Sequence, residues 1–171
     1  MKRVERAFSL LELMIVVSLV GILMMLTVAN VSFLGRAYVP TELEKIGALC
    51  RYMQQKALMT NVAQIITLDA TGSVHGYMFG VVRELLPRSI IFGAPAGIKG
   101  PPATPTRVIE SPITFKNSQI IFYPDGVISA GTLYLTNTEK TELYALTNGV
   151  GAVSFLRSYR YDKEWQLLTD R

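Results

Sequence analysis

The chain is poor in the residues that build covalent cross-links and metal sites. Its 171 residues include one cysteine, Cys50, and one histidine, His75. A single cysteine excludes an internal disulfide framework and a cysteine-based zinc site, and a single histidine excludes a multi-histidine metal site. No nucleophile, base and orienting group can be assembled from the motifs present. The sequence therefore predicts a non-enzymatic protein without a metal or a cofactor.

Charge is also scarce. Only 18% of the residues are charged and 50% are hydrophobic, whereas charged residues make up about a quarter of an average soluble protein. The net charge is +4, and part of the basic surplus comes from Lys2, Arg3 and Arg6 at the start of the chain. Such a modest surplus does not by itself indicate a nucleic-acid partner.

The hydrophobic excess lies near the N-terminus. Leu13 to Gly35 forms a run of 23 residues without a charged side chain. As a helix the run is about 34 Å long, enough to cross a hydrocarbon core of about 30 Å. The basic residues before it predict a cytoplasmic N-terminus and translocation of the rest. An ordinary signal peptide fits poorly, because its apolar region is shorter and ends in a small-residue cleavage site.

Glu12 stands at the edge of this apolar run. A carboxylate near the middle of a membrane helix costs roughly 2.5–3.5 kcal/mol, and less near an end. One interpretation is an interfacial glutamate at a helix start, where the helix dipole favours a negative charge. The other interpretation is a functional charge within the membrane.

The residues around Glu12 form a recognisable sequence motif. The segment from Arg6 reads Arg-Ala-Phe-Ser-Leu-Leu-Glu-Leu-Met-Ile-Val-Val, and it resembles the class III prepilin signal of type IV pilins and type II secretion pseudopilins. In that family a basic leader precedes a small residue, Phe-Thr-Leu-x-Glu and an apolar helix. Here Ala7 stands in place of the usual glycine and Ser9 in place of threonine.

The resemblance implies how the N-terminus is processed and used. Prepilin peptidase would cleave between Ala7 and Phe8, and the new Phe8 amine would be N-methylated. Glu12 would then be an assembly residue that sets the axial register by meeting the Phe8 amine of a neighbouring subunit. The implied partners are other pilin-like subunits, prepilin peptidase, an inner-membrane assembly platform and membrane lipid.

After the apolar run, the pattern predicts an amphipathic helix. Pro40 is expected to interrupt or kink the chain, and Thr41 with Glu44 has the spacing of a capping box for a restart. The apolar residues that follow recur every three or four positions, which predicts one helical face docked on a sheet. These residues are Leu43, Ile46, Cys50, Met53 and Ala57. Cys50 is expected to be a small buried hydrophobe.

The remainder reads as strands and turns. The pattern predicts strands at Val62–Asp69, Val74–Val82, Ser89–Phe92, Gln119–Tyr123, Thr132–Asn137, Leu143–Leu146 and Ala152–Arg160. Residues 93–106 hold three glycines and four prolines, which predicts an irregular loop. We expect an α+β fold: a long N-terminal helix, half transmembrane and half amphipathic, packed on an antiparallel, pilin-like β-sheet domain.

The expected divisions are a leader at 1–7, a transmembrane and assembly helix at 8–36, an amphipathic continuation at 37–61 and a periplasmic β-rich domain at 62–171. Within the last division, Leu86-Pro87 and Phe122-Tyr-Pro-Asp-Gly126 resemble the GspH/FimT type of minor pseudopilin and pilin. The resemblance implies a single-pass inner-membrane subunit with a periplasmic domain that enters a type II secretion pseudopilus.

The alternative is a FimT-like minor pilin that assists pilus assembly or captures DNA. Such proteins are expected to use a C-terminal Gly-Arg-x-Arg motif, and the nearest segment here offers Arg157 and Arg160 without the glycine. Residues 157–171 hold four basic and three acidic side chains, a weak footprint for nucleic acid, which is not expected as a partner. A membrane-anchored enzyme is the least favoured alternative.

His75 and the aromatic residues near the C-terminus are interpreted as structural rather than functional residues. His75 lies near a predicted hairpin and reads as a surface or strand residue. Trp165 with Tyr159 and Tyr161 could form an exposed aromatic contact, but a packing cluster at a strand end is favoured.

Overall fold

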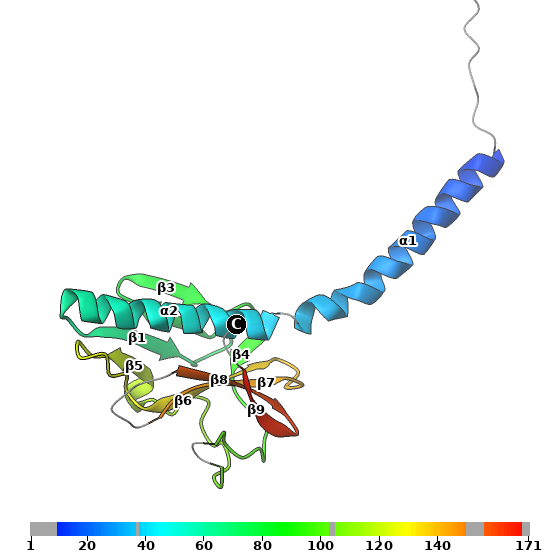
Figure 1. Cartoon of the computed structure of the whole chain (residues 1–171). Coiled ribbons are helices and arrows are strands. Elements are labelled where there is room, and N and C mark those ends of the chain that lie inside the picture. Colours follow the sequence, from blue (N-terminus) through cyan, green and yellow to red (C-terminus); the bar gives the residue numbers. More distant parts are fainter. Residues whose placement is uncertain (1–9, 37, 103–104, 150–155, 169–171) are drawn as a thin grey trace, which may run out of the picture. The chain divides into compact units, whose positions relative to one another are not determined.

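The computed structural model describes residues 10–36, 38–102, 105–149 and 156–168, with side chains described from Leu10 to Met25 and, within these ranges, from Val39 onward. The chain divides into two compact units, Met1–Gly35 and Arg36–Arg171. Helix α1 (Leu10–Arg36) makes up the described part of the first unit. The second holds helix α2 (Tyr38–Thr60) and the β-strands (Figure 1).

Helix α2 forms because its apolar residues recur at helical spacing and have sheets to pack on. The helix contacts strands from both sheets, and Figure 1 shows it lying along them. Its buried stripe consists of Val39, Leu43, Ile46, Cys50, Met53 and Ala57. All five residues of the predicted stripe are therefore confirmed as core. Glu42, which the apolar stripe does not include, is only 8% exposed.

The start of α2 differs from the prediction. The helix begins at Tyr38, so Pro40 lies in its first turn, where a missing backbone N–H breaks no helical hydrogen bond. The predicted N-cap at Thr41 is wrong, because Thr41 lies inside the helix. The expected long helix is described as two, with α1 ending at Arg36.

The strands form two antiparallel sheets, which confirms the α+β class. Sheet A has the order β3-β2-β1-β5 and sheet B the order β4-β6-β7-β8-β9. The strands of sheet A are β1 (Gln64–Asp69), β2 (Gly76–Phe79), β3 (Val82–Leu85) and β5 (Gln119–Phe122), the last preceded by the short helix η1 (Lys116–Ser118). Those of sheet B are β4 (Ile90–Phe92), β6 (Gly131–Asn137), β7 (Leu143–Asn148), β8 (Leu156–Asp162) and β9 (Glu164–Leu168).

Several predicted strands need correction. The single strand expected at Val74–Val82 is two strands, because the chain reverses at Gly80 and Val81, and Gly80 has φ +59°. Strand β9 was not predicted at all. The strand expected from Ala152 is described only as β8, since residues 150–155 lie outside the described part. Residues 93–102 form no helix or named strand, as their glycines and prolines predicted.

The Phe-Tyr-Pro-Asp-Gly motif makes a turn that joins sheet A to α2. The Gly126 N–H donates to the Tyr123 carbonyl at 3.0 Å, and Gly126 has φ +85°, a conformation that favours glycine. The Gln54 side chain on α2 donates to the Gly126 carbonyl at 2.7 Å. Phe122, the first residue of the motif, is fully buried. The motif therefore fixes the end of β5 against the helix.

Candidate functional site

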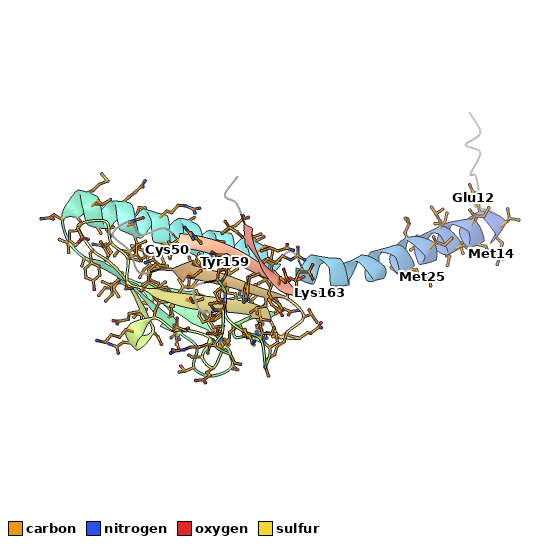
Figure 2. The ribbon with its side chains drawn as sticks, turned by 60° about the horizontal axis from the view of Figure 1, so that its bottom comes forward. Glu12, Met14, Met25, Cys50, Tyr159 and Lys163 are labelled. Carbon is orange, nitrogen blue, oxygen red and sulfur yellow. The ribbon has the colours of Figure 1, made fainter. Side chains whose placement is uncertain are left out.

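The residues predicted to be processed lie at the very start of the chain. Ala7 and Phe8 fall outside the described residues, so their roles stay predictions. Glu12 is described, and it lies in the first turn of α1. Figure 2 places Glu12 and Met14 near the N-terminal end of that helix. Glu12 therefore sits where the partial positive charge of the helix dipole favours a carboxylate.

The described side chains of α1 form an apolar surface on all sides of the helix. Glu12 is the sole charged residue between Leu10 and Met25. Thirteen large hydrophobic side chains in this segment are exposed, from 44% at Val20 to 80% at Met25. A helix that is apolar on every face is normally buried in a protein interior, a helix bundle or lipid. This segment is thus suited to apolar surroundings on every side.

The polar side chain in the middle of this segment is satisfied within the helix. The Ser18 hydroxyl donates to the Met14 carbonyl at 2.8 Å, which is the back-bonding typical of serine in apolar helices. No polar partner from outside the helix is required at this position. Glu12 is thus the one described side chain of the segment that brings a charge to the apolar surface.

Among the residues that the structure describes, none of the helices is both long enough and apolar enough to span a membrane.

Strand β8 separates the two arginines of the DNA hypothesis. Arg157 and Arg160 are both exposed, but they are three positions apart, and alternate residues of a strand point to opposite faces. Arg160 pairs with Tyr144, whose ring belongs to the core beneath α2. Arg157 lies on the other face, together with Tyr159. One ligand cannot contact both arginines on a single face of sheet B.

The aromatic residues near the C-terminus form a packing cluster, as predicted. Trp165 meets Tyr161 edge to face at 5.2 Å between ring centroids and lies 6.2 Å from Tyr134. Its indole N–H donates to the Lys99 carbonyl at 2.9 Å. Tyr159 is buried in the same cluster. The cluster anchors the glycine- and proline-rich loop on sheet B.

Cys50 lies in the core beneath α2. Cys50 is fully buried, and this burial raises the pKa of its thiol to about 12, so the nucleophilic thiolate is scarce at neutral pH. The prediction of a buried hydrophobe is confirmed. Within the described ranges, no three histidine, cysteine or acidic side chains lie close enough to hold a metal ion.

A charged cluster that the sequence did not reveal joins α2 to the β2–β3 hairpin. The Lys45 ammonium lies 2.5 Å from Glu84 and 3.6 Å from Glu42. The Tyr77 hydroxyl donates to Glu84 at 3.1 Å. The spacing of Glu42 and Lys45 signals a helical pair, but Glu84 arrives from β3, a strand that was not predicted separately.

The contacts of this cluster shift its pKa values. The hydrogen bond from Lys45 holds the pKa of Glu84 below its ordinary value, and the same contact raises the pKa of Lys45. Burial, the largest cause, raises the pKa of Tyr77 to about 12. Lys45 and Glu84 therefore both stay charged at neutral pH, with Tyr77 protonated and able to donate its hydrogen bond.

We expect the Lys45–Glu84 contact to stabilise the domain over a defined pH window. Because the pKa of Glu84 is depressed by folding, its contribution is present above the unfolded value of about 4.3 and is lost as the pH falls through the folded value. The raised pKa of Lys45 gives a contribution that is present below about pH 10.4 and is lost in stronger alkali. Both side chains are partly exposed, so screening limits the effect to less than about 1 kcal/mol.

Glu84→Gln tests this window. Chemical unfolding of the full chain, followed by Trp165 fluorescence, should show a small loss of stability at about pH 7 that shrinks towards zero near about pH 3. Glu139→Gln, in the exposed turn between β6 and β7, is the matched control and should change little. A loss of the same size at both pH values would contradict the assignment.

The N-terminal segment also has a known counterpart. Residues 2–28 match the family model described as the prokaryotic N-terminal methylation motif. The match indicates a type IV pilin-like or pseudopilin precursor. Such a precursor is processed by prepilin peptidase and assembles with other pilin subunits, and this motif is typical of membrane-anchored, structural proteins rather than enzymes. No curated protein and no solved structure matched the chain. Glu12 and the described apolar side chains of α1 lie inside the matched segment.

Proposed function

We propose that the chain is a minor pseudopilin of the GspH/FimT type, a structural subunit of a type II secretion pseudopilus. The observation that carries the proposal is the N-terminal segment, where a methylation motif covers residues 2–28. This motif includes the exposed apolar side chains Leu10 to Met25 of α1, among which Glu12 is the one charge. The β-rich domain, with a helix packed on antiparallel sheets, supports a pilin-like role.

In the proposed mechanism, cleavage after Ala7 creates a positive amine on Phe8 four residues before Glu12. Both charges are costly in an apolar layer when unpaired, and each lowers the cost of the other. Among packed helices, the Phe8 amine of an incoming subunit meets Glu12 of its neighbour and sets the axial register. The i,i+4 spacing also permits an internal pair before assembly.

The proposed location is the bacterial inner membrane, with the domain in the periplasm. Support comes from the uncharged run Leu13 to Gly35 and from the basic residues that precede it, since basic flanks favour the cytoplasmic side. In this arrangement membrane lipid and the inner-membrane assembly platform contact the helix before the subunit enters the pseudopilus.

The secretion role is preferred to DNA capture. A DNA-binding tip needs a contiguous basic surface, and β8 directs Arg157 and Arg160 to opposite faces. The secretion role needs only the apolar helix, the register charge and a folded domain.

Deleting the gene tests the proposed function. Proteins normally released by type II secretion should accumulate inside the cell envelope, while surface pili and DNA uptake continue at the parental level. Restoring the wild-type chain from a plasmid should restore secretion, and the empty plasmid is the control. Normal secretion combined with lost pili or lost DNA uptake would overturn the proposal in favour of the minor-pilin alternative.

A further inference from the structure

His75 occupies a position that the pilin-like role does not use. It lies directly before β2, and its main-chain carbonyl accepts a hydrogen bond from the Leu86 N–H at 2.9 Å, just after β3. Its side chain reaches the other sheet, where the Phe92 N–H donates to the imidazole Nδ1 at 2.7 Å. The imidazole and Phe92 rings also pack, with centroids 5.7 Å apart. One residue therefore connects the β2–β3 hairpin of sheet A to β4 of sheet B.

The hydrogen bond falls on the open edge of sheet B. Strand β4 is the first strand in that sheet and pairs with β6 on one side alone. An edge strand presents unpaired N–H groups that invite pairing with other chains, and folded proteins cover or blunt such edges. Here the imidazole covers the Phe92 N–H, and the Phe92 side chain is 2% exposed in the main core. At Phe92 the edge is thus covered by a side chain, whereas the Ile90 N–H of the same strand donates to the Pro87 carbonyl at 2.9 Å.

The covering contact depends on the protonation state of the ring. Nδ1 can accept a hydrogen bond only when it carries no proton, so the neutral tautomer with its proton on Nε2 is required. The imidazolium has N–H groups at both nitrogens and would face the Phe92 N–H with a second donor. Protonation therefore removes the acceptor and leaves a main-chain N–H unpaired, which is unfavourable in a buried position.

The charged surroundings of His75 are defined by three elements. Asp69 at the end of β1 has its pKa lowered mainly by hydrogen bonds from Thr71, with smaller contributions from Arg83 and His75. Arg83 on β3 binds the Asp69 carboxylate at 3.0 Å, which moderates its pull on an imidazolium. Strand β4 contributes only apolar side chains. A protonated ring is thus attracted towards Asp69, and on β4 it keeps the contact with the Phe92 ring but loses the hydrogen bond from the Phe92 N–H.

We propose that His75 is a pH-sensitive cap on the edge of sheet B. The neutral imidazole closes β4 against the hairpin, and the protonated imidazole releases it. Because β4 runs into the glycine- and proline-rich loop at Gly93, release also loosens the start of that loop. This inference concerns the domain alone and does not depend on the proposed secretion role.

Hydrogen exchange of the Phe92 amide tests the proposal. The full chain in detergent micelles is labelled with ¹⁵N-phenylalanine, which gives signals from seven phenylalanines, with Phe122 in β5 as an internal reference. After correction for intrinsic rates, protection of Phe92 should fall about tenfold between about pH 7.5 and about pH 5. Protection of Phe122 should not change.

Two variants separate capping from general stability. In His75→Asn, the Oδ1 atom can accept from the Phe92 N–H but does not titrate, so protection should persist at both pH values. In His75→Ala, protection of Phe92 should be low at both. Equal protection of wild-type Phe92 at both pH values would overturn the proposal, and so would a wild-type pH dependence in His75→Asn. If His75→Ala does not fold, the pH dependence of Phe92 protection in the wild-type chain and in His75→Asn still tests the proposal.

Discussion

Glu12→Val should abolish the recovery of other pilin-like subunits with this chain while leaving the domain folded. Valine replaces the one described charge on an otherwise apolar helix surface, so insertion into an apolar layer should be at least as favourable. The Phe8 amine of an adjoining subunit would lose its counter-charge in a low-dielectric environment, where an unpaired charge is strongly unfavourable. The measurement is crosslinking or co-purification from native membranes, together with a secretion assay.

Two companion variants separate charge from geometry. Glu12→Asp keeps the charge but shortens the reach by one methylene, so a partial defect is expected. Glu12→Gln keeps the size without the charge and should resemble the valine variant. Normal partner recovery and full secretion with Glu12→Val would refute the register role and leave Glu12 as a helix-start residue favoured by the dipole.

Ala7→Asp should prevent removal of the leader. The peptidase motif calls for a small residue directly before Phe8, and a charged side chain changes both the size and the polarity of that position. Without cleavage no Phe8 amine forms, so the precursor should stay in the membrane and be absent from assembled fractions. Ala7→Gly, which restores the residue usual in the family, is the matched control and should be processed at least as completely as the wild-type chain.

The outcome is read by gel mobility and mass spectrometry of the membrane fraction. Mature chain at the wild-type level in Ala7→Asp would mean that the processing site lies elsewhere. If cleaved and uncleaved chains assemble equally well, assembly does not require the Phe8 amine that cleavage creates. That result would contradict the proposed pairing of this amine with Glu12.

The helix and most strands could be predicted because each depends on local patterns. The stripe through Leu43 and Ala57 repeats at helical spacing, which predicts a helix with one buried face. The burial of Glu42 was not predicted, because it depends on how α2 packs on the rest of the domain. Strand β3 was not predicted as a separate strand, because the apolar pattern continues on both sides of Gly80. The chain reverses there because glycine can adopt a positive φ.

Some residues have roles that depend on contacts with segments distant in the sequence, and local patterns do not predict these roles. Gly131 is an example: a Cβ atom there would overlap the ring of Phe115 and come within 2.9 Å of its Cα, yet nothing local marks the position. His75 is another, because its acceptor role appears only when β4 lies beside it. The separation of Arg157 and Arg160, in contrast, follows from the two-residue period of a strand and could have been deduced from their spacing.

The mass of the mature chain tests the central claim most directly. The chain should be extracted from its native membrane, in a strain with active prepilin peptidase, and measured intact. We expect loss of the first seven residues and the addition of one methyl group, with the methyl located on the Phe8 amine by fragmentation. A chain that retains Met1 under these conditions would contradict the account.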